Sequence, residues 1–128
     1  MTQQDLIDNM TRTAKGMIED LQGYYEGKVM DPEDNRMKKE EEMEDEDEGI
    51  GLYEYLMDNY GLRYVIWADG TYDSCIITFA VGGPGIWLDT QRCEIRGHWG
   101  SDEVHVPLPD HLVELVDDEM SDVYRWRS

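Results

Sequence analysis

Carboxylates are the side chains of this sequence that are most concentrated and best placed to do chemistry. Residues 40–48 read EEEMEDEDE, so eight of nine side chains are acidic: Glu40, Glu41, Glu42, Glu44, Asp45, Glu46, Asp47 and Glu48. On a helix these charges would lie about 1.7 Å apart along the axis, close to the charge density of duplex DNA. In an extended chain the spacing would be about 3.7 Å, close to that of a single nucleic-acid strand. The run therefore resembles a polyanion, although blocks of like charge are also typical of self-repelling linkers.

A second set of carboxylates recurs at helical spacing near the end of the chain. Within residues 110–126, acidic residues occur at every fourth position with one more beside them: Asp110, Glu114, Asp118, Asp122 and Asp117. On a helix they form a stripe with steps of about 6 Å. Like charges four residues apart destabilise a helix by about 0.2–0.5 kcal/mol per pair, and no lysine interrupts them. The stripe is either a binding surface or a means of solubility, and the sequence leaves both interpretations open.

Three histidines invite a metal-binding or catalytic interpretation, but their spacing supports neither. His98, His105 and His111 are separated by 7 and 6 positions, which matches no zinc signature. His98 and His105 could meet on neighbouring strands, where Asp89 or Asp102 would supply a carboxylate. No third ligand stands at a recognisable spacing, so we expect no metal, no cofactor and no catalytic residues. A small metal-dependent hydrolase built on His98 and His105 is the enzymatic alternative.

The glycine-rich segment and the two cysteines also lack a catalytic pattern. Residues 82–85 read GGPG, which does not match the GxxxxGK[ST] phosphate loop, and no lysine is near them. Glycines at a sharp bend between strands explain this segment. Cys75 is predicted to lie in the core, and Cys93 has no neighbouring Cys or His that would make it a nucleophile.

The sequence is acidic well beyond these two sets. It has 30 Asp and Glu against 11 Lys and Arg, a formal net charge of −19, and without the eight acids of residues 40–48 the net charge would still be −11. Such a chain should avoid nucleic acid and anionic membranes and be attracted to basic proteins. The N-terminal residues show no signal-peptide pattern, and two cysteines make no disulfide framework. We therefore expect a cytoplasmic protein with reduced thiols.

A length of 128 residues predicts one domain, residues 1–128, that begins with a helix over residues 4–25. Apolar side chains recur there at helical spacing: Leu6, Ile7, Met10, Ala14, Met17, Ile18, Leu21, Tyr24 and Tyr25. Asp31-Pro32 breaks this pattern. The charged residues that follow predict a flexible acidic insert at about 31–49. A short helix is predicted over residues 52–60, ending at Gly61.

The next segment carries a hairpin signal. Asp69-Gly70, between residues 62–68 and 71–81, predicts a two-residue turn. This register would place Leu62 opposite Ile77, Tyr64 opposite Cys75 and Ile66 opposite Asp73. The core face would then hold Leu62, Tyr64, Ile66, Cys75, Ile77, Phe79 and Val81. The other face would pair Trp67 with Tyr72.

The rest of the chain predicts a second hairpin, an edge strand and a helix. The hairpin covers residues 86–90 and 93–99, the edge strand 104–108 and the helix 110–126, whose buried side chains would be Leu112, Leu115, Val116, Met120, Val123 and Tyr124. The predicted fold class is therefore α+β. Its order is an N-terminal helix, an acidic insert, a short helix, a four- to five-stranded antiparallel sheet and a C-terminal helix, with the helices on one face of the sheet.

Residues 82–102, GGPGIWLDTQRCEIRGHWGSD, resemble a family of small proteins carried on bacterial phages and conjugative elements. The family pattern is Gly-Gly-Pro, a variable residue, Ile, an aromatic residue, Asp-Thr and a later Trp-Gly-x-Asp. It is met by Gly82, Gly83, Pro84, Ile86, Trp87, Asp89, Thr90, Trp99, Gly100 and Asp102. Gly85 departs from the pattern, which usually has Asn there. The resemblance covers residues 62–126 and implies a counter-defence role more readily than a metabolic one.

In size and charge the chain is also similar to anti-CRISPR and anti-restriction proteins that imitate nucleic acid. Together with the acidic segments, this similarity predicts a non-enzymatic inhibitor of a host defence nuclease, such as a CRISPR effector. The inhibitor would act in the cytoplasm of a bacterial host as a monomer or dimer. Its acidic residues would bind a basic groove in place of nucleic acid, with Trp67, Tyr72 or Trp87 as anchors. The alternative is an acidic interaction module that binds another basic partner.

Overall fold

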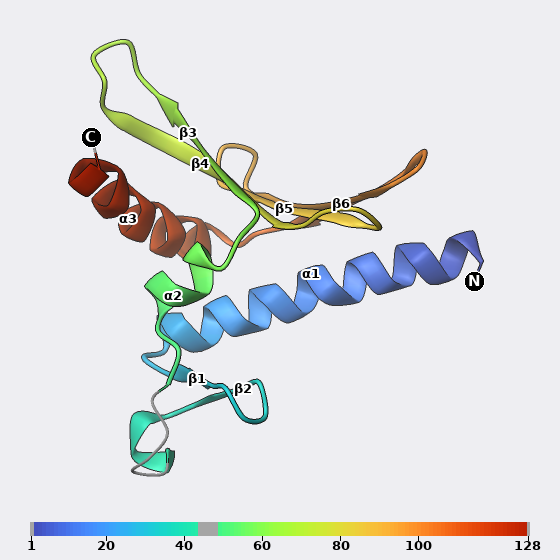
Figure 1. The fold of residues 1–128 in the computed structure, drawn as a ribbon, viewed down its shortest axis with the longest axis horizontal. Helices are drawn as coiled ribbons and strands as arrows, with labels where there is room; N and C mark the ends of the chain where they lie inside the picture. The colour runs from blue at the N-terminus through green and yellow to red at the C-terminus, as the bar shows by residue number, and fades with distance from the viewer. Residues whose placement is uncertain (1, 44–48, 128) are drawn as a thin grey trace.

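The structure is a computed structural model that describes residues 2–43 and 49–127 (Figure 1). Its elements are α1 (Gln3–Tyr25), β1 (Val29–Asp31), β2 (Arg36–Lys38), the 3-10 turn η1 (Glu40–Glu42), α2 (Leu52–Met57), β3 (Gly61–Ile66), β4 (Tyr72–Ala80), β5 (Gly85–Asp89), β6 (Glu94–Trp99), β7 (Asp102–Pro107) and α3 (Asp110–Arg127). This order confirms the predicted α+β fold class. Within the described ranges, no helix combines the length and the apolar character that crossing a membrane requires.

The main sheet has five antiparallel strands in chain order, β3–β4–β5–β6–β7. Helices α1 and α3 lie on the same side of this sheet (Figure 1). The hydrophobic core fills the space between them, as the amphipathic patterns of the helices predict. Its central members are Met10, Ala14 and Leu21 of α1, Leu56 of α2, Cys75, Ile77, Leu88 and Ile95 of the sheet, and Leu112, Val116 and Met120 of α3.

Helix α1 begins where its first N–H groups find side-chain acceptors. The Thr2 hydroxyl accepts from the Asp5 N–H at 3.1 Å, and the Asp5 carboxylate accepts from the Thr2 N–H at 3.1 Å. This reciprocal capping box stabilises the first turn. The helix ends at Tyr25, and Gly27 follows it with a φ of 84°, a conformation that favours glycine. The predicted range of 4–25 is therefore confirmed to within one residue.

The hairpin of β3 and β4 has a longer loop than the predicted two-residue turn. The Trp67 N–H donates to the Thr71 carbonyl at 2.9 Å, and the Gly70 N–H donates to the Trp67 carbonyl at 2.9 Å. Gly70 has a φ of 88°, as the last residue of a three-residue hairpin loop requires. The Asp69 carboxylate accepts from the Thr71 N–H at 3.0 Å and from its hydroxyl at 2.7 Å. These local bonds favour the three-residue loop.

The register at the base of this hairpin is as predicted. Leu62 lies opposite Ile77, and Tyr64 lies opposite Cys75. Both members of the β4 side, Ile77 and Cys75, are fully buried. Val81 was predicted on the same core face but is 56% exposed, because β4 ends at Ala80 and leaves it in the following loop.

Near the loop, however, the register shifts by one residue. Ile66 lies opposite Tyr72 and not opposite Asp73, with the shift between Val65 and Ile66. Asp73 is thus the extra residue of a β-bulge, and the bulge turns Tyr72 toward the helices. Ile66 and Trp67 are 49% and 62% exposed. The predicted core position of Ile66 and the predicted outer-face pair of Trp67 and Tyr72 are therefore wrong.

Part of the predicted acidic insert is a small hairpin formed by β1 and β2. The Lys38 ammonium lies 2.7 Å from the buried Asp31 carboxylate, and it holds the pKa of Asp31 below its usual range. Met37 packs on α1 so closely that a Cβ at Gly23 would lie 2.7 Å from it. This hairpin is thus anchored to the domain, and the dense acidic run begins only after it.

Helix α2 is shorter than the predicted range of 52–60 because the chain joins the sheet early. The Tyr60 N–H donates to the Thr78 carbonyl of β4 at 2.8 Å, so it is not available to a helix. The Asn59 side chain donates to the Leu56 carbonyl at 2.7 Å and satisfies one acceptor at the helix end. Strands β5, β6 and β7 and helix α3 each lie within two residues of their predicted bounds.

Candidate protein-binding surface

Four acidic side chains of α3 are exposed to solvent along one broad side of the helix: Asp110, Glu114, Asp118 and Asp122. We call these four residues the α3 stripe. Among the described residues, Asp110, Glu114 and Asp118 contact no basic side chain, while Asp122 accepts from the Arg125 guanidinium at 3.1 Å. Their spacing gives steps of about 6 Å along the axis. Three successive carboxylates therefore have no basic partner among the described residues. Each like-charge pair destabilises the helix by about 0.2–0.5 kcal/mol.

Asp117, predicted to lie beside this stripe, has a different environment. Its carboxylate is half-buried and accepts from the Tyr72 hydroxyl of β4 at 2.6 Å. Burial raises the pKa of Asp117, and the Tyr72 hydrogen bond partly opposes that rise. Asp117 is next to Asp118 in sequence, but the helix rotates about 100° per residue and turns it toward the sheet. It connects α3 to the sheet and is not exposed with the stripe.

The acidic run of residues 40–48 is only partly described. Glu40, Glu41 and Glu42 form η1 and are exposed. The other five predicted site residues lie outside the described residues: Glu44, Asp45, Glu46, Asp47 and Glu48. In Figure 1, η1 lies below α2 and α3 lies above it. Helix α2 thus lies between η1 and α3 in this view.

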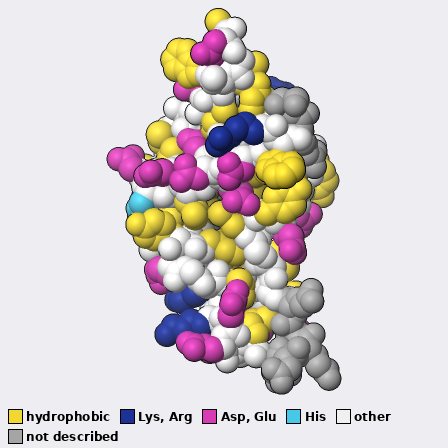
Figure 2. All heavy atoms as spheres, turned by 90° about the vertical axis from the view of Figure 1, so that its left-hand side faces the viewer, with side chains coloured by type: hydrophobic (Ala, Val, Ile, Leu, Met, Phe, Trp, Pro, Cys, Tyr) yellow, Lys and Arg dark blue, Asp and Glu magenta, His cyan; other side chains and the backbone are white. Residues whose placement is uncertain are grey.

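The side of the molecule that carries the end of α3 is rich in both acidic and hydrophobic side chains. Figure 2 shows Asp and Glu side chains gathered across the middle of this face, at the height of α3, next to exposed hydrophobic side chains. Exposed aromatic side chains next to charge are typical of surfaces that bind proteins. This face thus places exposed hydrophobic side chains beside acidic ones.

The three predicted aromatic anchors differ in their accessibility. Trp67 is 62% exposed at the tip of the β3–β4 hairpin. Tyr72 is half-buried and donates to Asp117, as described above. Trp87 is half-buried, and the Arg96 guanidinium lies 5.7 Å from the centre of its ring. Only Trp67 of the three presents its ring to solvent in the way that a binding anchor requires.

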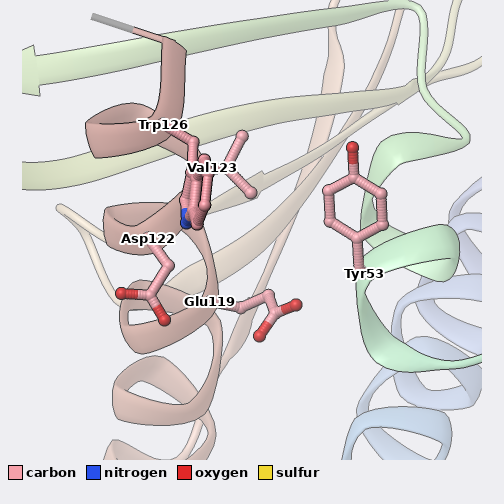
Figure 3. A pocket seen from close by; sticks show the side chains of 5 residues that line it. All are labelled: Tyr53, Glu119, Asp122, Val123 and Trp126. Carbon is pink, nitrogen blue, oxygen red and sulfur yellow. The ribbon is translucent and has the colours of Figure 1, made fainter.

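Sequence reasoning missed two exposed aromatic side chains near the acidic stripe. Trp126, at the end of α3, is 88% exposed, and Tyr53 of α2 is 46% exposed. Together with Glu119, Asp122 and Val123 they line a hollow between α2 and α3 of about 320 Å³ (Figure 3). We call it the α2–α3 groove. The sequence held a signal that these two side chains are exposed. Tyr53 falls outside the predicted apolar side of helix 52–60, and Trp126 is the last residue of the predicted helix 110–126.

The histidines have separate partners and do not converge. His105 contacts Glu94 through Nδ1, and its Nε2 lies 3.3 Å from Glu103. His111 Nε2 lies 2.6 Å from the amide oxygen of Gln22. No group of three or more His, Cys, Asp or Glu side chains that could hold a metal ion occurs in the described part of the chain. The predicted approach of His98 to His105 does not occur as a direct contact, because His98 lies opposite Glu103 in the register.

Two glycines of the GGPG segment have a packing role beside the tryptophans of the same pattern. A Cβ at Gly83 would lie 2.0 Å from the Trp99 ring, and a Cβ at Gly85 would lie 2.5 Å from the Trp87 ring. No side chain fits at either position unless a ring moves. These glycines are therefore needed for close packing.

The next two residues of the pattern, Asp89 at the end of β5 and Thr90 just after it, are equally structural. The buried Asp89 carboxylate accepts from the Arg92 N–H at 2.9 Å and lies 3.4 Å from the Arg96 guanidinium. The Thr90 hydroxyl accepts from the Cys75 N–H at 2.9 Å, and burial raises the pKa of the Cys75 thiol to about 11. The thiol is therefore protonated at neutral pH and is a poor nucleophile. These residues of the pattern thus support the sheet, while the α3 stripe lies on a helix.

No protein-family model, no curated protein and no solved structure matches this chain.

Proposed function

We propose that this protein is a non-enzymatic inhibitor that binds a basic groove of a nucleic-acid enzyme and keeps nucleic acid out of it. The α3 stripe supplies fixed carboxylates, and the acidic run of residues 40–48 adds a dense negative charge. The proposed target is a host defence nuclease, with a CRISPR effector as the first choice. The resemblance of residues 82–102 to proteins of mobile elements supports this choice, because such elements encounter these nucleases.

The observation that carries the proposal is the row of three uncompensated carboxylates on a well-packed helix. Asp110, Glu114 and Asp118 contact no basic side chain within the described ranges. Asp110 lies in the first turn, where the helix N-terminus favours an acid, but lysine in place of Glu114 or Asp118 would make the helix more stable. On the opposite side of α3, Leu112, Val116 and Met120 are fully buried. The helix that carries the charges is therefore held in place before binding, which lowers the backbone entropy lost on association.

The two acidic segments would contribute differently. The α3 stripe carries one charge per about 6 Å of axis, a lower density than the one per about 3.4 Å of a single nucleic-acid strand. Residues 40–48, with eight acids in nine positions, match or exceed the density of a strand. The stripe would thus define the orientation of the complex. The run would strengthen the long-range attraction, which speeds association and weakens with salt.

The test is to titrate the protein against a panel of CRISPR effectors and restriction nucleases while cleavage of target DNA is measured. The wild type should inhibit at least one of them, less strongly as salt rises. The stripe variant Glu114→Lys with Asp118→Lys should inhibit at least about tenfold less, because two attractive charges become repulsive in a basic groove. Its fold should hold, because both side chains are exposed and the new lysines would attract Asp110 and Asp122.

A control variant with the same change of charge separates position from net charge. Asp8→Lys with Glu19→Lys alters two exposed positions of α1, where Arg12 and Lys15 already lie between them. Each new lysine would lie four residues from Arg12 or Lys15, at a cost of about 0.2–0.5 kcal/mol per pair, so the melting temperature of this variant is compared with that of the wild type. This variant should keep inhibition within about threefold of the wild type. Equal inhibition by the stripe variant and the wild type would assign the stripe to solubility. If the wild type inhibits no nuclease of the panel, the inhibitor proposal fails and the alternative, a module that binds another basic protein, takes its place.

A further inference from the structure

We propose that the α2–α3 groove receives an arginine side chain of the basic partner. This proposal rests on the proposed function, since it assumes a basic protein as the partner, but it names a subsite that the acidic segments alone do not define. Its occupant is a guanidinium group held between aromatic rings and carboxylates.

The groove is small and has walls from two elements. Its volume of about 320 Å³ is at the lower end of the range of ligand pockets, about 300–1,000 Å³. Figure 3 shows Tyr53 on the α2 side, with Trp126, Val123 and Glu119 on the α3 side facing it across the hollow. A space of this size fits one long side chain and not a helix or a strand.

The aromatic walls suit a cation. Trp126 is 88% exposed and Tyr53 is 46% exposed, so their rings are open to a ligand. The face of an aromatic ring attracts a cation, tryptophan most strongly, and arginine is found in such contacts more often than lysine. An uncharged apolar ligand would gain from the rings alone but not from the two carboxylates beside them.

The carboxylates supply the complementary charge. Asp122 already accepts from a guanidinium, that of Arg125, at 3.1 Å in an exposed pair. Exposed pairs of this kind are weak. Figure 3 shows the Asp122 carboxylate directed away from Tyr53, so it adds negative charge at the edge of the groove. Glu119 contacts no basic side chain within the described residues, and Figure 3 shows its carboxylate directed toward the groove. A planar guanidinium can stack on a ring while it forms a forked pair with a carboxylate, which an ammonium cannot do.

The test uses a capped peptide with three Gly-Arg repeats as the probe and isothermal titration at physiological salt as the measurement. Two matched peptides replace every arginine by lysine or by neutral citrulline. The arginine peptide should bind at least about threefold more tightly than the lysine peptide, and the citrulline peptide should not bind measurably. In NMR spectra the indole N–H signal of Trp126 should shift more than that of Trp67 on addition of the arginine peptide.

Trp126→Ala and Trp67→Ala both leave the net charge unchanged, so comparing them separates binding in the groove from general attraction to an acidic protein. Trp126→Ala should weaken binding of the arginine peptide by about three- to tenfold, and Glu119→Gln should weaken it to a similar extent. Trp67→Ala removes another exposed tryptophan, one that does not line the groove, and should change binding by less than about twofold. All three changes are at side chains outside the core, so each variant should keep the wild-type melting temperature.

Several results would overturn this proposal. Equal binding by Trp126→Ala and the wild type, or equal binding of the arginine and lysine peptides, would show attraction by the acidic surface alone. If the wild type sediments as a dimer and Trp126→Ala as a monomer, the groove is an interface between copies of this chain. Peptide binding as expected with no nuclease inhibited would leave the groove standing and remove the inhibitor function. A nuclease inhibited equally by the wild type and Trp126→Ala would support the inhibitor function and contradict the arginine subsite.

Discussion

Tyr72 connects the sheet to α3 through a single hydrogen bond in an aromatic environment. Its hydroxyl donates to Asp117 at 2.6 Å, and its ring centre lies 6.1 Å from that of Tyr64 and 6.3 Å from that of Tyr124. Burial raises the pKa of Asp117, while the hydrogen bond from Tyr72 opposes the rise. Removal of the hydroxyl would thus leave a half-buried carboxylate with one donor fewer.

We predict that Tyr72→Phe lowers the free energy of unfolding by about 1 kcal/mol at neutral pH. The loss should shrink as the pH falls through the pKa of Asp117, because a protonated carboxyl needs the donor less. Urea unfolding at several pH values measures both effects. Tyr60→Phe is the control, since Tyr60 is 73% exposed and should lose almost nothing. Equal stability of the two variants would show that the Tyr72–Asp117 bond does not stabilise the fold.

His105 makes the stability of the sheet edge depend on pH. Its ring contacts the carboxylate of Glu94 and, 3.3 Å away, that of Glu103. These contacts, with Glu94 the stronger, raise the pKa of His105. The folded state therefore binds this proton more tightly than the unfolded state. The resulting stability is fully present below the ordinary histidine pKa of about 6.5 and is lost as the pH rises through the raised value.

We predict that His105→Gln reduces the loss of stability between about pH 6 and about pH 8 relative to the wild type. Chemical unfolding at the two pH values provides the measurement. Glu94→Gln removes the other half of the main contact and should reduce the loss in the same direction. If the wild type and both variants lose the same free energy of unfolding over this range, the contact between His105 and Glu94 does not raise the pKa of His105.

At the scale of elements, the acidic run is flanked by segments that are themselves fixed. Before it, Lys38 binds Asp31 at 2.7 Å. After it, Ile50 and Met30 exchange two backbone hydrogen bonds of 2.8 and 3.1 Å, and the Tyr24 hydroxyl donates to the Ile50 carbonyl at 2.8 Å. The run thus joins two anchored points, and its length matters more to the fold than its side chains do.

We predict that replacing residues 40–48 by glycine and serine at equal length leaves the free energy of unfolding within about 0.5 kcal/mol of the wild type or raises it slightly. The described acids of the run, Glu40–Glu42, are exposed, and Met43 is half-buried. Replacing the acids relieves repulsion. Thermal unfolding measures the change.

The same replacement at Arg36–Lys38 is the control for this prediction. It should destabilise the protein clearly, because Met37 packs on Gly23 and Lys38 binds the buried Asp31. A cooperative loss of structure on replacing residues 40–48 would mean that the run packs into the domain.

At the scale of the whole molecule, negative charge governs what this protein can approach. The formal net charge is −19 for 128 residues. An acidic surface repels polyanions and attracts basic proteins over about a Debye length, which is about 8 Å at physiological salt. The proposed function uses this property directly, since a mimic of nucleic acid must not itself bind nucleic acid.

We predict no binding of DNA or RNA oligonucleotides at physiological salt, with any dissociation constant weaker than about 1 mM. A mobility-shift titration with single- and double-stranded probes makes the measurement. Repeating it in low salt is the stricter test, because any electrostatic binding to nucleic acid is strongest there. A micromolar dissociation constant would contradict the mimicry argument as a whole.

Much of the fold follows from the sequence alone because local patterns define it. The apolar spacing of residues 4–25, reinforced by the cap at Thr2, specifies α1 without reference to the rest of the chain. The apolar stripe of residues 110–126 does the same for α3. For the candidate site, the sequence supplied the α3 stripe, because residues four apart on a helix must share a side.

The tertiary structure decided where single side chains point and which elements meet. The bulge at Asp73 turned Tyr72 toward α3 and so gave Asp117 an internal partner, which no periodicity predicts, since one inserted residue reverses the faces of a strand. The groove depends on Tyr53 and Trp126, which are 73 positions apart. They meet only because α2 and α3 pack against the same core, and that packing depends on side-chain volumes summed over the whole molecule.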